Sequence, residues 1–150
     1  MPSLLYRSAY VLPIAAALAL VPGSSGASES DVRASMQCDR ATEPGRVRCA
    51  VDVRIEGGRA IAWADVEILA LPEFASALKG RIGPQDALSR DATTIKWALG
   101  LVARRAGAGE ARARVRVVAC DPAGAGAPPN ELRTRCSPLV VEVKASLQIG

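Results

Sequence analysis

Apolar and polar residues alternate along much of the chain, and this two-residue period constrains the possible folds more than any other feature. In one run, every second residue from Val47 to Ile55 is apolar, and most of the residues between them are charged. Successive side chains of a β-strand point to opposite faces, so this pattern is typical of strands with one buried face. Similar runs occupy 32–38, 61–71, 95–101, 111–117 and 139–149.

These runs predict an all-β protein of about six or seven strands, with no long amphipathic helix. An antiparallel two-sheet sandwich, immunoglobulin-like in the broad sense, accommodates such a set most simply, and a small barrel is the alternative. Pro-Gly at 44–45 predicts a type II turn, and 106–109 a further turn. We expect one or two helical turns at 72–79 and a long loop at 81–93.

Residues 1–27 have the pattern of a cleavable signal peptide. A single positive charge at Arg7 precedes an apolar run from 9 to 21. At helical rise this run spans about 20 Å, which is too short for a bilayer core of about 30 Å. Small residues up to Ala27 suit signal peptidase, so we place cleavage after it, and an uncleaved anchor is the alternative. The remaining residues, 28–150, have the size of a single domain.

The composition of 28–150 limits the kinds of partner. Removal of 1–27 takes away one arginine and no acidic residue, so the net charge falls from +4 to a mild +3. The aromatic residues that remain are Trp63, Phe74 and Trp97. Proteins that bind single-stranded nucleic acid stack bases on several aromatic side chains, so nucleic acid is not an expected partner. We predict that both tryptophans are core residues rather than parts of a ligand platform.

All four cysteines lie in 28–150, and an even number in an exported protein predicts two disulfides. We favour the pairs Cys38–Cys49 and Cys120–Cys136, because the two partners in each pair are close in sequence across a turn-rich segment. Sequence alone leaves two other pairings open. A zinc site is the rival interpretation, although the chain has neither a C-x-x-C motif nor a histidine.

The lack of histidine excludes several common catalytic arrangements. Ser-His-Asp and Cys-His pairs cannot form, and no imidazole is present as a general base or as a zinc ligand. Phosphate-binding glycine motifs are also missing from the sequence. We therefore predict no cofactor and no metal, and we favour a non-enzymatic role.

Asp65 and Glu67 are a candidate pair of catalytic carboxylates, because they share a predicted strand face with Trp63. Two positions apart on one strand, they are separated by about 7 Å and do not face each other across a cleft, as glycosidases require. We therefore interpret them as part of a solvated face or as partners of arginines.

Arg112, Arg114 and Arg116 project from one face of a predicted strand, and Arg104 and Arg105 lie across the preceding turn. Such a row is a candidate binding site for an anionic polymer: lipopolysaccharide, a polyanionic glycan or nucleic acid. The alternative is that arginine provides the polar half of an alternating strand.

The C-terminal third has the order strand, Cys120, loop, Cys136, Ser-Pro, strand. Over residues 95–149 this order resembles the C-terminal part of the N-terminal periplasmic domain of the thiol:disulfide interchange reductase. The resemblance implies an immunoglobulin-like sandwich in which Cys120 and Cys136 are a redox pair that passes electrons to periplasmic partners. The loop 121–135 is longer than in that family. A disulfide that closes such a loop stabilises the fold by about 3 kcal/mol, so a structural disulfide is the alternative.

The sequence thus supports three hypotheses. The first is a non-enzymatic exported β-sandwich, periplasmic or secreted, which interacts with another envelope or periplasmic protein and has no transmembrane segment in its mature chain. The second is a thiol–disulfide exchange domain that uses Cys120 and Cys136. The third is an anion-binding surface formed by Arg112, Arg114 and Arg116.

Overall fold

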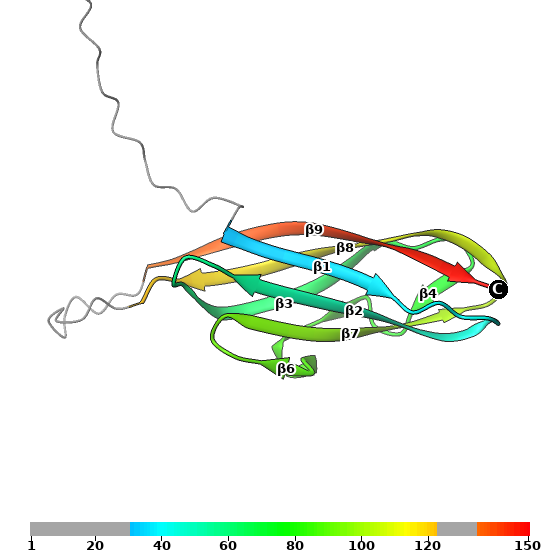
Figure 1. Ribbon diagram of the computed structural model, residues 1–150, viewed down its shortest axis with the longest axis horizontal. Coiled ribbons are helices and arrows are strands. Elements are labelled where there is room, and N and C mark those ends of the chain that lie inside the picture. Colours follow the sequence, from blue (N-terminus) through cyan, green and yellow to red (C-terminus); the bar gives the residue numbers. More distant parts are fainter. Residues whose placement is uncertain (1–30, 123–134) are drawn as a thin grey trace, which may run out of the picture.

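Two antiparallel β-sheets face each other in the computed structural model, which describes residues 31–122 and 135–150. The predicted signal peptide at 1–27 lies outside the described residues. Sheet A has the order β1-β2-β7-β4, with β6 also paired to β7, and sheet B has the order β5-β3-β8-β9 (Figure 1). The strands are β1 (Val32–Cys38), β2 (Gly45–Ile55), β3 (Ala60–Ala70), β4 (Ala75–Ala77), β5 (Arg81–Ile82), β6 (Ser89–Arg90), β7 (Thr94–Ala103), β8 (Gly107–Cys120) and β9 (Cys136–Ile149). The predicted all-β sandwich is therefore confirmed.

The long strands β1, β2, β3, β7, β8 and β9 correspond to the six alternating runs of the sequence. Their apolar residues fill the space between the sheets, and the most buried large side chains are Trp97, Ile95, Leu101, Leu147 and Val51. Trp97 is 1% exposed, and its indole N–H donates a 2.8 Å hydrogen bond to the carbonyl of Gly83. The prediction that Trp97 belongs to the core is confirmed.

The segment 72–93 differs from the predicted helical turns and long loop. It contains three short strands, β4, β5 and β6, and one 3₁₀ turn, η2 (Pro84–Asp86). β4 and β6 pair with β7, whereas β5 pairs with β3, so the segment crosses from sheet A to sheet B and back. Backbone groups at a sheet edge need partners, and this segment supplies them: the N–H of Leu78 donates to the carbonyl of Gly100 at 2.9 Å. Pairing with distant strands therefore overrides the local helical signal.

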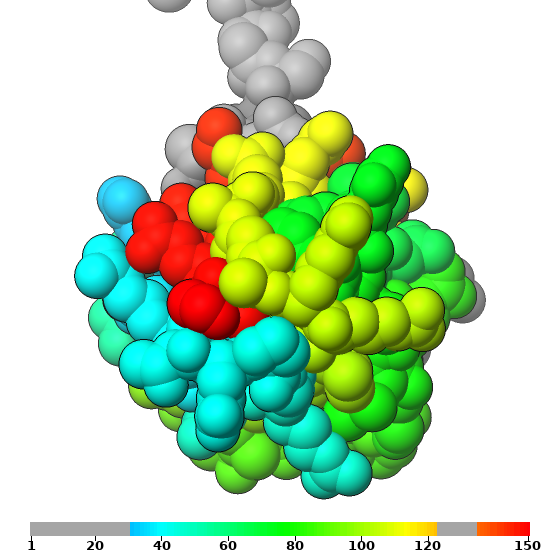
Figure 2. All heavy atoms as spheres, turned by 90° about the vertical axis from the view of Figure 1, so that its right-hand side faces the viewer, coloured from blue at the N-terminus to red at the C-terminus, as the bar shows by residue number. Residues whose placement is uncertain are grey.

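The connection between β1 and β2 is wider than the tight turn predicted at 44–45. After β1, Ala41 forms a parallel bridge with Ile149 of β9, so the chain reaches across to sheet B before it enters β2. Figure 2 shows this end of the molecule, where the cyan connection lies against the red end of β9. The turn between β7 and β8 occupies 104–106 rather than 106–109, because Gly107 already pairs in β8.

Candidate functional site: the outer face of sheet B

Both favoured disulfides are present, and each joins directly opposed residues of neighbouring antiparallel strands. Cys38 of β1 is bonded to Cys49 of β2, and Cys120 of β8 is bonded to Cys136 of β9. All four sulfur atoms are engaged in these bonds, so the zinc interpretation is wrong. Each disulfide closes the end of one hairpin.

The two disulfides face opposite sides of their sheets. Cys49 is 0% exposed and belongs to the hydrophobic core, and its partner Cys38 is partly buried against that core. On β8, Val117 and Ala119 point into the core, so Cys120, one position further, lies on the outer face of sheet B, although it is itself only 9% exposed. Its partner Cys136 is exposed. Cys38–Cys49 is therefore a core disulfide, and Cys120–Cys136 is a surface disulfide.

Apolar side chains surround the surface disulfide. The strand register places Trp63, Val118 and Pro138 in one row across β3, β8 and β9, beside the row that contains the disulfide. Val140 follows Pro138 on the same face of β9. Trp63 is 39% exposed and Val140 is 43% exposed, which is unusual for large apolar side chains in this molecule. We call this surface the disulfide patch and define it as Trp63, Val118, Cys120, Cys136, Pro138 and Val140.

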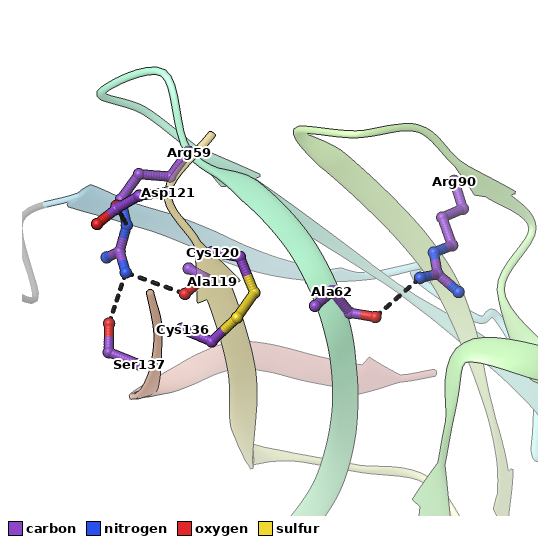
Figure 3. The surroundings of a disulfide bond; sticks show 8 residues. All are labelled: Arg59, Ala62, Arg90, Ala119, Cys120, Asp121, Cys136 and Ser137. Carbon is purple, nitrogen blue, oxygen red and sulfur yellow. Dashed lines mark hydrogen bonds and ion pairs between the residues drawn. A yellow bond between two sulfur atoms is a disulfide. The ribbon is translucent and has the colours of Figure 1, made fainter. Parts of the chain in front are cut away.

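A β-bulge brings Trp63 to the surface, and the prediction that Trp63 is a core residue is wrong. Ala62 is an extra residue in β3, because Ile61 and Trp63 pair with consecutive residues of β8. The insertion reverses the alternation, so that Ile61 is buried before the bulge and Ala64 is buried after it. Arg90 supports the bulge by donating a 3.1 Å hydrogen bond to the carbonyl of Ala62 (Figure 3).

Next to the patch, the carboxylate of Asp65 is buried although it lies on the outer face of the sheet. Asp65 is 2% exposed and accepts two hydrogen bonds from Arg116, whose guanidinium lies 5.6 Å from the ring centroid of Trp63. The hydrogen bonds from Arg116 to Asp65 raise the pKa of Arg116 above its ordinary value. Arg81 lies 3.7 Å from Asp65 and 2.9 Å from Glu67. The two carboxylates therefore act as partners of arginines, and the solvated-face interpretation is wrong for Asp65.

The other arginines of the predicted row are also ion-paired. Arg112 and Arg114 of β8 lie 3.2 Å and 3.6 Å from the two oxygens of Glu142 on β9. Across the preceding turn, Arg105 lies 3.6 Å from Glu73. These contacts supply a structural role for the row, while its binding of an anionic polymer stays a prediction.

Arg59 connects the same strand ends as the surface disulfide, by hydrogen bonds. This residue was not identified from the sequence. It lies just before β3, is buried, and donates hydrogen bonds to Asp121 (2.8 Å), to the carbonyl of Ala119 (3.0 Å) and to the hydroxyl of Ser137 (2.5 Å). Ala119 and Ser137 are the residue pair next to Cys120–Cys136. Figure 3 shows Arg59 and the disulfide on opposite sides of the end of β8. The hydrogen bonds of Arg59 and the Cys120–Cys136 disulfide therefore both connect the paired ends of β8 and β9.

Within residues 31–122 and 135–150, no group of three or more histidine, cysteine or acidic side chains is arranged to hold a metal ion. The same residues contain no helix with the length and apolar character required to cross a bilayer.

The sheets, their register and the two cross-strand disulfides define an immunoglobulin-like β-sandwich. No protein-family model matches the sequence, and no curated protein matches it. The solved structure of the ASH / PapD-like domain of human CEP192 (PapD-like domain 7) is similar, with a TM-score of 0.45 and 10% identity, over 92% of this chain and 98% of that one. BslA, a bacterial hydrophobin, is similar with a TM-score of 0.31 and 12% identity, over 78% of this chain and 93% of that one. The resemblance of residues 95–149 to the thiol:disulfide interchange reductase stays a prediction.

Proposed function

We propose that the protein is an exported, non-enzymatic β-sandwich that binds another protein through the disulfide patch. The observation that carries this proposal is the position of Trp63, Val140 and the surface disulfide together on one solvent-facing side of sheet B. An exposed, contiguous apolar surface of this kind is a mark of an interaction site.

The composition of the patch and its border favours a protein as the partner. Protein interfaces typically have an apolar centre enriched in tryptophan and a charged rim enriched in arginine. Here Trp63, Val118 and Pro138 form the centre, and the ion pair of Arg116 with Asp65 borders it on one side. The border contains both charge signs, which suits a specific protein surface better than a uniformly charged polymer.

Export is supported by the cysteine chemistry and by the N-terminal sequence. Both disulfides are formed, and stable disulfides are typical of the periplasm and of secreted proteins. The pattern of residues 1–27 is that of a signal peptide, which export requires.

The binding proposal predicts face-specific crosslinking in the cells that make the protein. A photo-crosslinking amino acid at Val140, in the patch, is expected to yield one major adduct, whose partner mass spectrometry identifies. The same amino acid at Gln37, an exposed residue on the outer face of sheet A, is the matched control and is expected to yield no such adduct. Adding Trp63→Ala to the Val140 variant is expected to lower the adduct yield roughly tenfold or more, because interface tryptophans carry much of the binding energy.

Equal adducts from both positions, or none from Val140, would show that the patch is not a protein-binding face. An adduct between two copies of the chain would replace the proposed partner by a homodimer.

A second candidate function is thiol–disulfide exchange, and the outward position of Cys120–Cys136 is the observation that favours it. In the exchange, a thiolate of a dithiol protein attacks Sγ of the exposed Cys136, and the electron pair of the broken S–S bond leaves on Sγ of Cys120. A second thiolate of the partner then attacks the mixed disulfide, so that the partner is oxidised. Cys120 and Cys136 are released as thiolates and become thiols when they take up protons from solvent.

A further inference from the structure

The outer face of sheet A contains arginines that form no salt bridge within the described residues. Among the described residues, Arg46, Arg48 and Arg54 of β2 form no ion pair within 4 Å, in contrast to the paired arginines of sheet B. Two other basic residues of this face are paired: Arg33 lies 2.7 Å from Glu56, and Lys96 lies 3.3 Å from Asp52. We call the five basic residues the basic face and define it as Arg33, Arg46, Arg48, Arg54 and Lys96.

The strand register brings like charges together on this face. Arg33 of β1 and Arg54 of β2 are directly opposed, and Thr94 of β7 is the next residue in the same row. Like charges directly opposite each other destabilise a sheet, and an anion that contacts both guanidinium groups relieves that repulsion. Asp91 also lies near Arg54: hydrogen bonds from the N–H groups of Thr93 and Thr94, both at 2.8 Å, lower the pKa of Asp91 most, and the charge of Arg54 lowers it further.

A shallow depression of about 400 Å³ lies over this row. Its polar lining combines three cations, two hydroxyl groups and one carboxylate, from Arg33, Ser35, Asp52, Arg54, Thr94 and Lys96. Guanidinium, ammonium and hydroxyl groups together are the donors that sulfate and phosphate groups accept.

The remaining arginines extend the basic face along β2. Arg46 and Arg48 lie at the start of the strand, and about 26 Å separates Arg46 from Arg54 at the rise of an extended strand. Between Arg48 and Arg54 the outward residues of β2 are Ala50, opposite Ala98, and Asp52, opposite Lys96, whereas Gly100 lies opposite Arg48 next to the side chain of Leu78. Unpaired arginines therefore lie near both ends of the outer face of β2.

We propose that the basic face binds a linear anionic glycan whose sulfate or phosphate groups contact Arg54 at one end and Arg46 and Arg48 at the other. This inference is independent of the proposed function, because it concerns the opposite face of the sandwich. A glycan fits better than a nucleic acid, because none of the described outward residues of β1, β2 and β7 is aromatic and could stack on a base.

The test uses heparin as the sulfated probe and the mature chain with both disulfides intact. Replacement of Arg46, Arg48 and Arg54 by serine is expected to raise the Kd roughly 10- to 100-fold, which corresponds to the loss of three exposed charge contacts. The control replaces Arg112, Arg114 and Lys144 on sheet B by serine. It changes the net charge equally, retains Arg116 over Asp65, and is expected to alter the Kd less than about threefold.

A third variant separates loss of binding from loss of folding. Replacement of the same three sheet A arginines by lysine keeps the charge and is expected to retain binding within a few-fold. An equal loss in both serine variants, or no binding by the native chain, would contradict the proposal. A loss in the sheet B variant alone would assign the site to the arginine row on β8, and tighter binding of a single-stranded oligonucleotide of equal charge would replace the glycan by a nucleic acid.

Discussion

Trp97→Ala is expected to lower the free energy of unfolding by about 3–5 kcal/mol, as is typical when a large buried aromatic side chain is removed from a core. Trp97 is surrounded by core residues and its indole N–H satisfies the carbonyl of Gly83, so the variant loses packing and leaves an acceptor without its partner. Equilibrium denaturation in urea, with the disulfides intact, measures the change.

Trp63→Ala is the matched control for this prediction. Because the bulge at Ala62 places Trp63 on the outer face, we expect its removal to cost about 1 kcal/mol or less. Similar losses for the two tryptophans would contradict the register of β3 against β8 and would return Trp63 to the core.

Arg59→Ala is expected to lower the free energy of unfolding by about 2–4 kcal/mol, because it removes charge-assisted hydrogen bonds to Asp121, Ala119 and Ser137 at a buried position. Arg59→Lys keeps the charge but cannot reproduce the fork of the guanidinium, so most of the loss is expected to remain. Asp121→Asn is the control, since the Asp121 side chain is half-exposed and the variant leaves the other two hydrogen bonds in place. Its expected cost is about 1 kcal/mol or less.

Amide hydrogen exchange adds a local readout for Arg59. In Arg59→Ala we expect faster exchange only at the paired ends of β8 and β9, because the lost hydrogen bonds to Ala119 and Ser137 lie there. Unchanged stability and unchanged exchange in Arg59→Ala would show that the surface disulfide alone holds the strand ends together.

The strands could be predicted from the sequence because alternation is a local property that directly reflects burial. The run from Val47 to Ile55 became β2, and its apolar residues lie in the core as expected. Both disulfides could be predicted for a related reason: each joins strands that are adjacent in sequence, so the short separation reflects a hairpin.

The candidate site was harder to predict because it depends on departures from regularity. The single inserted residue Ala62 reverses the face of Trp63, and no local signal marks it. Arg59 contacts residues about sixty to eighty positions away in sequence, which only the folded chain reveals. The orientation of the surface disulfide does have a local signal in the sequence, because Cys120 is out of phase with the inward residues Val115 and Val117 of the same strand.

The same limit applies to the charged residues. Arg112, Arg114 and Arg116 form a row that the sequence reveals because they alternate on one strand, yet the carboxylates that pair with them lie on other strands. Whether an arginine is free or paired depends on the neighbours that the sheet supplies, and this is why the unpaired arginines of sheet A were identified only from the structure.

The assignment of Cys38–Cys49 to the core face of its sheet, and of Cys120–Cys136 to the outer face within the disulfide patch, rests on strand alternation and burial. Stepwise reduction of the native protein by dithiothreitol tests it, with acid quench, alkylation and mass spectrometry to count the thiols of each pair. A potential for the surface pair above about −270 mV would support the exchange function, and one below about −300 mV would limit the pair to a structural role within the binding patch. We expect Cys120–Cys136 to be reduced roughly 100-fold faster, because attack on the core pair requires a local opening that costs about 3 kcal/mol. Equal rates, or earlier reduction of Cys38–Cys49, would contradict the assignment of the two disulfides to opposite faces.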